Sequence, residues 1–198
     1  DGTDHAGIRW FELRKQGSNP WDLYQEGTWA PDSHHRFMGS IAMDGSGNIA
    51  LGYSISSDTM HPSIRYAVRS RYDPLGTLQT EASLMEGGGS ATGVVRWGDY
   101  SAMNVDPMDQ CTFWITNEYH DVDDVGYSWN TRIGAFKIPG CTGSLGPVGY
   151  LDGTITDSST SNPIESASVQ ATGLVPTHTN MTISDASGYY RMVMPTDT

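Results

Sequence analysis

The sequence predicts an all-β fold, and three observations support this class. The 198 residues include 23 glycines and many serines, threonines and aromatic residues, a composition that favours strands and turns over helices. Apolar and aromatic residues recur in short alternating runs bounded by turn residues, which is the period of a strand and not of a helix. A sequence repeat with an offset of 60 residues organises these runs.

The repeat is clearest where residues 24–43 align without a gap on residues 84–103, with five identities in twenty positions. Arg36 falls on Arg96, and Met43 falls on Met103. One period is expected to contain four strands, at 37–43, 48–55, 64–71 and 81–86. Four short strands in a unit of this length are typical of one blade of a β-propeller, which buries its faces against neighbouring blades.

The other strands expected in residues 1–141 are assigned to incomplete blades. Strands at 8–14 and 21–28 are interpreted as the last two of one blade, and strands at 97–104, 111–119 and 131–138 as the first three of another. About two and a half four-stranded blades cannot close a ring, since propellers have about four to eight. We therefore expect upstream blades in a longer parent protein. The missing fourth strand would come from the N-terminal end of that parent or from a partner chain.

Cys111 and Cys141, the two cysteines of the chain, are predicted to form a disulfide. If 111–119 and 131–138 are antiparallel neighbours, the start of the first strand lies opposite the end of the second. Two unrelated buried thiols are the alternative. A disulfide implies an oxidising compartment, so the expected location is secreted or at the cell surface.

The charge of the chain excludes some functions. Its 23 acidic residues outnumber 11 basic ones, which argues against a nucleic-acid partner. No apolar run is long enough to span a membrane, and residues 1–5 do not resemble a signal peptide, so a mature chain or a fragment is expected. The sequence contains no common hydrolase or phosphate-loop motif.

A short linker at 142–148 is expected to separate residues 1–141 from a second module at 149–198. This module contains Gly153-Thr-Ile-Thr-Asp157, Asn162-Pro-Ile164, Ala167-Ser-Val169 and Thr182-Ile-Ser-Asp-Ala-Ser-Gly-Tyr-Tyr190. With these motifs it resembles the carboxypeptidase regulatory-like domain, a transthyretin-like β-sandwich of bacterial surface proteins. The resemblance implies at least one more strand after Pro195, so we expect an incomplete sandwich that is truncated or completed by another strand.

The first module, with Arg96-Trp-Gly-Asp-Tyr-Ser-Ala-Met103 and Cys111-Thr-Phe-Trp114, resembles the repeats of secreted bacterial sialidase-like propellers. The aspartate box of true sialidases is absent from both corresponding turns, so the resemblance concerns the fold. It implies a ligand-binding rim at the upper ends of the inner strands. The candidate rim residues are His34, His35, Arg36, Arg96, Asp99, Tyr100, Glu118 and His120.

Two interpretations of the rim arginines stay open. They could clamp a carboxylate of a ligand, as in a sialidase-like site. Alternatively, because Arg36 and Arg96 repeat at equivalent positions, they would brace neighbouring blades by pairing with Asp99 or Glu118. The second interpretation is favoured, since a repeated contact suits structure better than a single asymmetric site.

Calcium is the one cofactor considered. Asp121, Asp123 and Asp124 could supply oxygen ligands to a hard cation, but a solvated acidic loop is the favoured interpretation. Asn180-Met-Thr182 matches the acceptor pattern for N-linked glycans.

Three functions are considered. The first is a non-enzymatic extracellular protein that is structural, adhesive or ligand-binding, with glycans among its partners. The second is a sialidase-like or other glycoside-active enzyme. The third is a subunit of a filament or surface layer assembled by strand donation through the incomplete sandwich.

Overall fold

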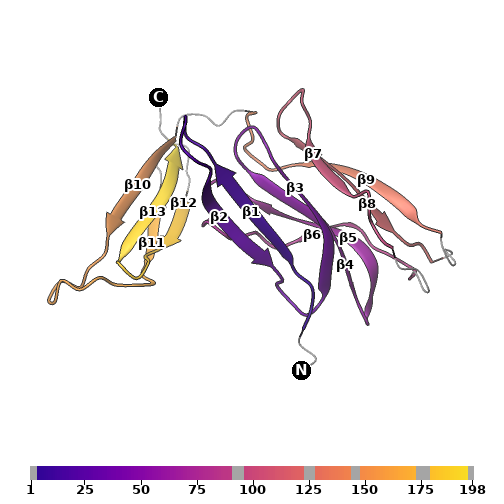
Figure 1. The fold of residues 1–198 in the computed structure, drawn as a ribbon, viewed down its shortest axis with the longest axis horizontal. Coiled ribbons are helices and arrows are strands. Elements are labelled where there is room, and N and C mark those ends of the chain that lie inside the picture. The colour runs from indigo at the N-terminus through magenta and orange to yellow at the C-terminus, as the bar shows by residue number, and fades with distance from the viewer. Residues whose placement is uncertain (1–3, 91–95, 123–127, 144–147, 173–178, 196–198) are drawn as a thin grey trace.

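The computed structural model describes residues 4–90, 96–122, 128–143, 148–172 and 179–195, and all regular elements in these ranges are β-strands (Figure 1). None of these residues forms a helix that could cross a membrane. The strands are β1 (Ile8–Arg14), β2 (Asp22–Trp29), β3 (His35–Met43), β4 (Ile49–Ser57), β5 (Met60–Arg69), β6 (Ala82–Met85), β7 (Ala102–Val105), β8 (Thr112–Tyr119), β9 (Asn130–Lys137), β10 (Val148–Thr154), β11 (Ser168–Thr172), β12 (Thr179–Ile183) and β13 (Tyr189–Pro195).

The strands form five small antiparallel sheets, none of which closes within the described residues. The first sheet contains β1 and β2, the central sheet follows the order β3-β4-β5-β6, and the third sheet follows the order β7-β8-β9. In the C-terminal unit, β10 pairs with β13 and β11 pairs with β12. The all-β prediction is confirmed. Each strand expected in residues 1–141 is present, β1 with the expected bounds and the others with shifted bounds.

The central sheet is covered on both faces, and β4 shows this most clearly. Alternate side chains of a strand point to opposite faces of its sheet. On β4, Leu51 and Tyr53 pack with Trp10 of the first sheet, whereas Ala50 packs with Phe113 of the third sheet. Seven consecutive residues of β4 are buried. The strand therefore does not alternate between buried and exposed residues, as a strand would in a sheet with one solvent-exposed face.

Close contact between the central and third sheets depends on small residues and hydrogen bonds. A side chain at Gly52 would collide with Ile115, so the two sheets approach closely at this position. The backbone N–H of Met103 donates to Ser40 Oγ at 2.8 Å. These contacts place β7 directly beside β3, the first strand of the central sheet.

Strand β7 begins five residues later than the sequence predicts. Residues 91–95 lie outside the described ranges, and Gly98 has a positive φ of 61°, which is not a strand conformation. Trp97 instead donates from its indole N–H to Ser54 Oγ at 3.1 Å. Side-chain contacts, and not backbone hydrogen bonds between paired strands, therefore position the segment before β7.

The outer faces of the first and third sheets remain uncovered by described residues. Phe11 and Leu13 of β1 are 53% and 56% exposed, and Ile133 of β9 is 65% exposed. The third sheet also lacks a described strand beside β9, whereas the equivalent strand of the central sheet, β5, pairs with β6. The first, central and third sheets together form a three-sheet stack. Within the described residues, the outer faces of this stack are exposed, whereas both faces of its central sheet are buried.

The C-terminal unit is organised by aspartate-stabilised turns. Asp185 accepts hydrogen bonds from the backbone N–H groups of Ser187 and Tyr189, and Gly188 adopts a φ of 74° in the hairpin between β12 and β13. Asp157 accepts from the N–H groups of Ser159 and Thr160. The expected hairpin turn at 185–188 is therefore present.

Candidate functional site

The predicted rim residues lie at one end of the central and third sheets, where β3 and β7 begin and β8 ends. The structure does not gather them into one pocket. His34 and His35 line one open pocket, Tyr100 and Glu118 line another, and Arg36 is buried between the sheets. The rim therefore contains separate arrangements that differ in exposure and chemistry.

Arg36 is the centre of a buried ion-pair network. Its guanidinium donates to both oxygens of Asp32, at 2.7 and 2.9 Å, and to both oxygens of Glu81, each at 2.9 Å. The hydroxyl of Tyr53 donates to Glu81 at 2.6 Å, and the indole N–H of Trp29 donates to the Tyr53 oxygen at 2.6 Å. Since Trp29 lies on β2, the network joins the first sheet to the central sheet.

The electrostatics of this network keep its groups in their ordinary charge states at neutral pH. Hydrogen bonds from Arg36 lower the pKa of Asp32 to about 2. Burial raises the pKa of Glu81, but hydrogen bonds from Arg36 and Tyr53 outweigh it, so the pKa lies below its ordinary value. Burial together with the Glu81 contact raises the pKa of Tyr53. A general acid or base works best with a pKa near the working pH, so the network suits bracing better than proton transfer.

The second rim arginine has a different environment. Arg96 pairs with Asp99, and its side chain is 75% exposed, whereas the Arg36 side chain is fully buried. Glu118 accepts a hydrogen bond from the N–H of Gly98 at 2.8 Å. Arg96 and Asp99 are three residues apart in one exposed segment, so their pair does not join two sheets, while Arg36 uses other carboxylates. The two arginines are therefore not equivalent in three dimensions.

The histidine pocket is open and polar, with a volume of about 270 Å³. His35 Nδ1 accepts a hydrogen bond from the backbone N–H of Ala6 at 3.2 Å, and the N–H of His34 donates to Asp32 at 2.9 Å. The lining residues are Asp4, His5, Ser33, His34, His35, Ser57, Asp58 and Thr59. Within the described ranges, no three histidine, cysteine or carboxylate side chains converge in a way that could hold a metal ion.

The rim groove lies between the start of β7, the end of β8 and the start of β9, with a volume of about 90 Å³. Two aromatic residues on its wall are strongly exposed, Tyr100 at 90% and Trp129 at 62%. Polar groups share the wall. The full lining is Gly98, Tyr100, Ser101, Thr116, Asn117, Glu118, Trp129 and Thr131. Such a surface can stack an apolar ligand face on the rings while the polar groups bind hydroxyls.

His120 is not available to a ligand. It is 2% exposed and stacks on Trp97, with 5.3 Å between the ring centroids. Its backbone carbonyl accepts hydrogen bonds from the N–H groups of Gly88 and Gly89. Its contacts tie the end of β8 to the glycine-rich segment after β6.

Of the three aspartates expected to bind calcium in the acidic loop, the structure describes Asp121. Asp121 is exposed and accepts a hydrogen bond from the N–H of Val122 at 2.7 Å. Asp123 and Asp124 lie outside the described residues. Calcium binding at this loop stays a prediction.

The Cys111–Cys141 disulfide is present, with 5.7 Å between the Cα atoms. Thr112 pairs with Lys137 in the ladder, so the start of β8 faces the end of β9 as predicted. In the chain-entropy model, closing a loop over this separation of 30 residues stabilises the fold by ~3–4 kcal/mol. A disulfide fits an oxidising, extracellular environment.

Sequence reasoning missed several residues of these sites. Asp32 carried a weak signal, since it lies four residues before Arg36. Glu81 is 45 residues from Arg36, and Trp129 is far along the chain from Tyr100, so no local pattern indicated the place of either residue.

Comparisons of this chain with protein-family models, curated proteins and solved structures found no match. Function is therefore inferred from the geometry and chemistry of the described residues.

Proposed function

We propose that this chain is part of a secreted or cell-surface protein that binds a glycan without catalysis, through the rim groove at Tyr100 and Trp129. The observation that carries the proposal is the pair of strongly exposed aromatic rings on one polar groove. Aromatic side chains are usually buried or half-buried, so two of them exposed together suggest a contact surface. Neighbouring hydroxyl and carboxylate groups of Ser101, Thr131 and Glu118 would bind sugar hydroxyls.

The proposed architecture is a set of propeller blades at 1–141 and a β-sandwich at 149–198. In support, the central sheet is a four-stranded antiparallel meander packed on both faces by similar sheets. The uncovered outer faces of the stack would be buried by upstream blades or by a neighbouring chain. The C-terminal unit would act as a spacer.

A glycoside-active enzyme is less well supported than a binding protein. Glycoside hydrolysis generally uses two carboxyl groups on either side of the scissile bond. Glu118 is the one carboxylate among the residues that line the rim groove, and it already accepts a backbone hydrogen bond.

Assembly by strand donation is the second candidate, and the edge of β9, which none of the described strands covers, favours it. The corresponding strand of the central sheet has its edge covered by β6, through pairs such as Ile64 with Met85. An unpaired edge is a template for another strand. A filament or surface-layer subunit would use this edge.

The glycan proposal is tested by titrating the full chain with a panel of neutral oligosaccharides and measuring binding by calorimetry. We expect Trp129→Ala and Tyr100→Ala to weaken binding at least tenfold. Trp114→Ala is the matched control, because Trp114 is an exposed tryptophan (45%) on β8 that does not line this groove. Absence of binding to the whole panel, or equal losses in all three variants, would reject the proposal, and turnover of fluorogenic glycosides would reject its non-catalytic part.

A further inference from the structure

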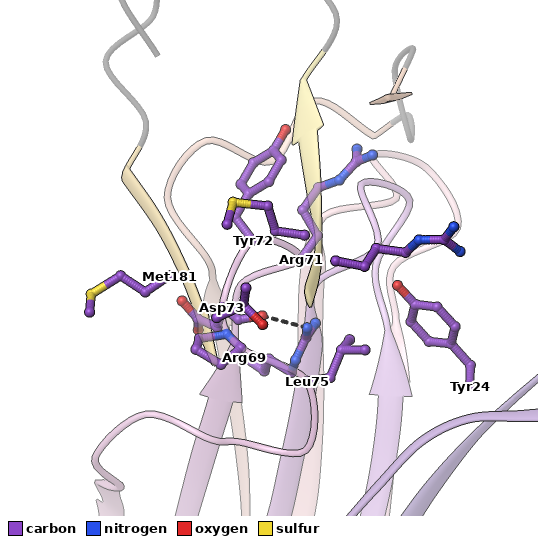
Figure 2. A pocket seen from close by; sticks show the side chains of 11 residues that line it. Tyr24, Arg69, Arg71, Tyr72, Asp73, Leu75 and Met181 are labelled. Atoms are coloured by element: carbon purple, nitrogen blue, oxygen red, sulfur yellow. Dashed lines mark hydrogen bonds between the residues drawn. The ribbon is translucent and has the colours of Figure 1, made fainter. Parts of the chain in front are cut away.

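A second cavity lies where the central sheet meets the C-terminal unit, at the end of β5 opposite the rim (Figure 2). It encloses about 70 Å³ and is lined by Tyr24, Arg69, Arg71, Tyr72, Asp73, Pro74, Leu75, Met181, Thr182, Arg191 and Met192. A larger open groove of about 410 Å³ adjoins it and shares Tyr24, Arg69 and Arg71. Because the two hollows share these residues, we describe them together as the basal site.

The basal site is cationic on a strongly acidic protein. The formal net charge of the chain is −12, with 11 basic residues in total. Five of these basic residues line the basal site, against two acidic ones. The basic residues are Arg14, Lys15, Arg69, Arg71 and Arg191, and the acidic ones are Glu12 and Asp73. The local charge is therefore opposite in sign to that of the molecule.

Arg69 is the decisive residue, because it is buried with part of its donor set unused. Its relative exposure is 3%, and its Nε has no hydrogen-bond partner. Its Nη2 donates to the backbone carbonyl of Asp73 at 2.7 Å, a contact drawn as a dashed line in Figure 2. Burial lowers the pKa of the guanidinium. The nearby charges of Asp73 and Glu12 offset this effect only in part. Burying a charge without a directly bound partner is costly, and a bound anion would reduce that cost.

The two nearby carboxylates serve other partners. Asp73 Oδ2 accepts from the N–H of Ser70 at 2.8 Å and from the amide of Gln79 at 2.7 Å. Glu12 is bound by Arg14 and by the side-chain amide of Gln25. Neither carboxylate forms an ion pair with Arg69 among the described contacts.

We propose that the basal site binds an oxoanion group, a carboxylate or a sulfate, with the fork of Arg69 as its anchor and Arg71 and Arg191 as supporting cations. Planar guanidinium groups bind such anions through paired hydrogen bonds. Trp21 and Tyr150, which are exposed on the adjoining groove, provide apolar surface for the rest of a ligand. The anion is either a free ion or an acidic group on a polysaccharide.

Such a ligand would contact both units of the chain. Arg69 and Arg71 lie at and just after the end of β5, whereas Arg191 and Met192 belong to β13 of the C-terminal unit. Figure 2 shows Arg69 between Tyr24 on one side and Met181 of β12 on the other. Binding would therefore also hold the C-terminal unit against the central sheet.

The test measures the thermal midpoint of the full chain with sodium sulfate or sodium acetate against sodium chloride at equal ionic strength. We expect the oxoanions to raise the midpoint above the chloride value, and Arg71→Gln and Arg191→Gln to remove at least half of this increase. Arg132→Gln is the matched control, since Arg132 is an exposed arginine on β9, remote from the site. Arg69→Lys keeps the charge but removes the fork, and it should reduce the increase if the variant folds.

A second arm distinguishes the sources of the anion. Binding of polygalacturonate or chondroitin sulfate at least tenfold tighter than that of the free ions would identify a polysaccharide ligand, and the reverse order would identify a free anion. The proposal is overturned if neither oxoanion exceeds chloride and neither polymer binds. Equal responses of Arg71→Gln, Arg191→Gln and Arg132→Gln would also overturn it.

Discussion

The three-sheet stack and the C-terminal unit stabilise their strands in different ways. The stack buries two apolar clusters, one on each face of the central sheet, with Phe113, Tyr53 and Ile64 fully inaccessible. In the C-terminal unit, the buried residues within the described ranges are Ser184, Gly188 and Met192. Turn hydrogen bonds and backbone pairing organise that unit more than side-chain packing does.

This difference indicates how cooperative each region is. Apolar burial couples a whole sheet to its neighbours, whereas turn hydrogen bonds act over a few residues. We therefore expect the stack to unfold as one unit, and the C-terminal unit to open locally at lower free energy.

The largest expected effect is that of Phe113→Ala in the stack. Phe113 is fully buried and stacks on Phe136 at a centroid distance of 5.5 Å, so truncation leaves a cavity and should lower the free energy of unfolding by about 3–5 kcal/mol. Chemical denaturation followed by tryptophan fluorescence measures it. Ile133→Ala on the outer face of the same sheet is the control and should cost less than about 1 kcal/mol. A loss as large as that of Phe113→Ala would show that another chain covers this face.

A smaller and local effect is expected for Ser184→Ala in the C-terminal unit. The hydroxyl of Ser184 donates to the carbonyl of Ile164 at 2.5 Å and accepts from the N–H of Ala167 at 3.0 Å. Its removal leaves both backbone groups without this partner and should cost about 1–3 kcal/mol. Hydrogen exchange should quicken in β11 and β12 and stay unchanged in β8, while the exposed control Ser158→Ala changes neither. Faster exchange in β8 would contradict the independence of the two regions.

The smallest effect concerns acid stability of the stack through Asp32 and Glu81. Both carboxyls have a lowered pKa in the folded state, so they stabilise the fold above their unfolded pKa and lose this contribution as the pH falls through the folded value. For Asp32 the window extends from about 3.8 down to about 2. Denaturation midpoints measured from pH 6 to pH 2 should fall less steeply in Glu81→Gln than in the native protein or in Glu165→Gln. Equal slopes would show that the Arg36 network does not contribute.

Local sequence patterns were sufficient for the strands and for the disulfide. Alternating apolar and polar residues locate the strands, because successive side chains of a strand point to opposite faces of the sheet. On β8, for example, Phe113 is buried and Trp114 is exposed. The Cys111–Cys141 bond followed from a single antiparallel pair. The start of β7 was misplaced because Gly98 adopts a positive φ in a segment held by side-chain contacts.

The sites depended on contacts between distant residues. Arg36 was expected to pair with Asp99 or Glu118, but it meets Glu81, which directly precedes β6 of the same central sheet and is 45 residues away in the sequence. The basal site brings together residues of β1, β2, β5 and β13, and no local spacing of Arg14, Arg69 and Arg191 indicates this proximity.

The all-β class, the strand positions and the disulfide were determined by the sequence itself, because each rests on interactions within a strand or between neighbouring strands. Only the tertiary structure decided which faces of the sheets are covered and which charged groups find partners. Burial and desolvation arise when sheets far apart in the chain pack together. For that reason the partner of Arg36 and the unused Nε of Arg69 become visible in three dimensions alone.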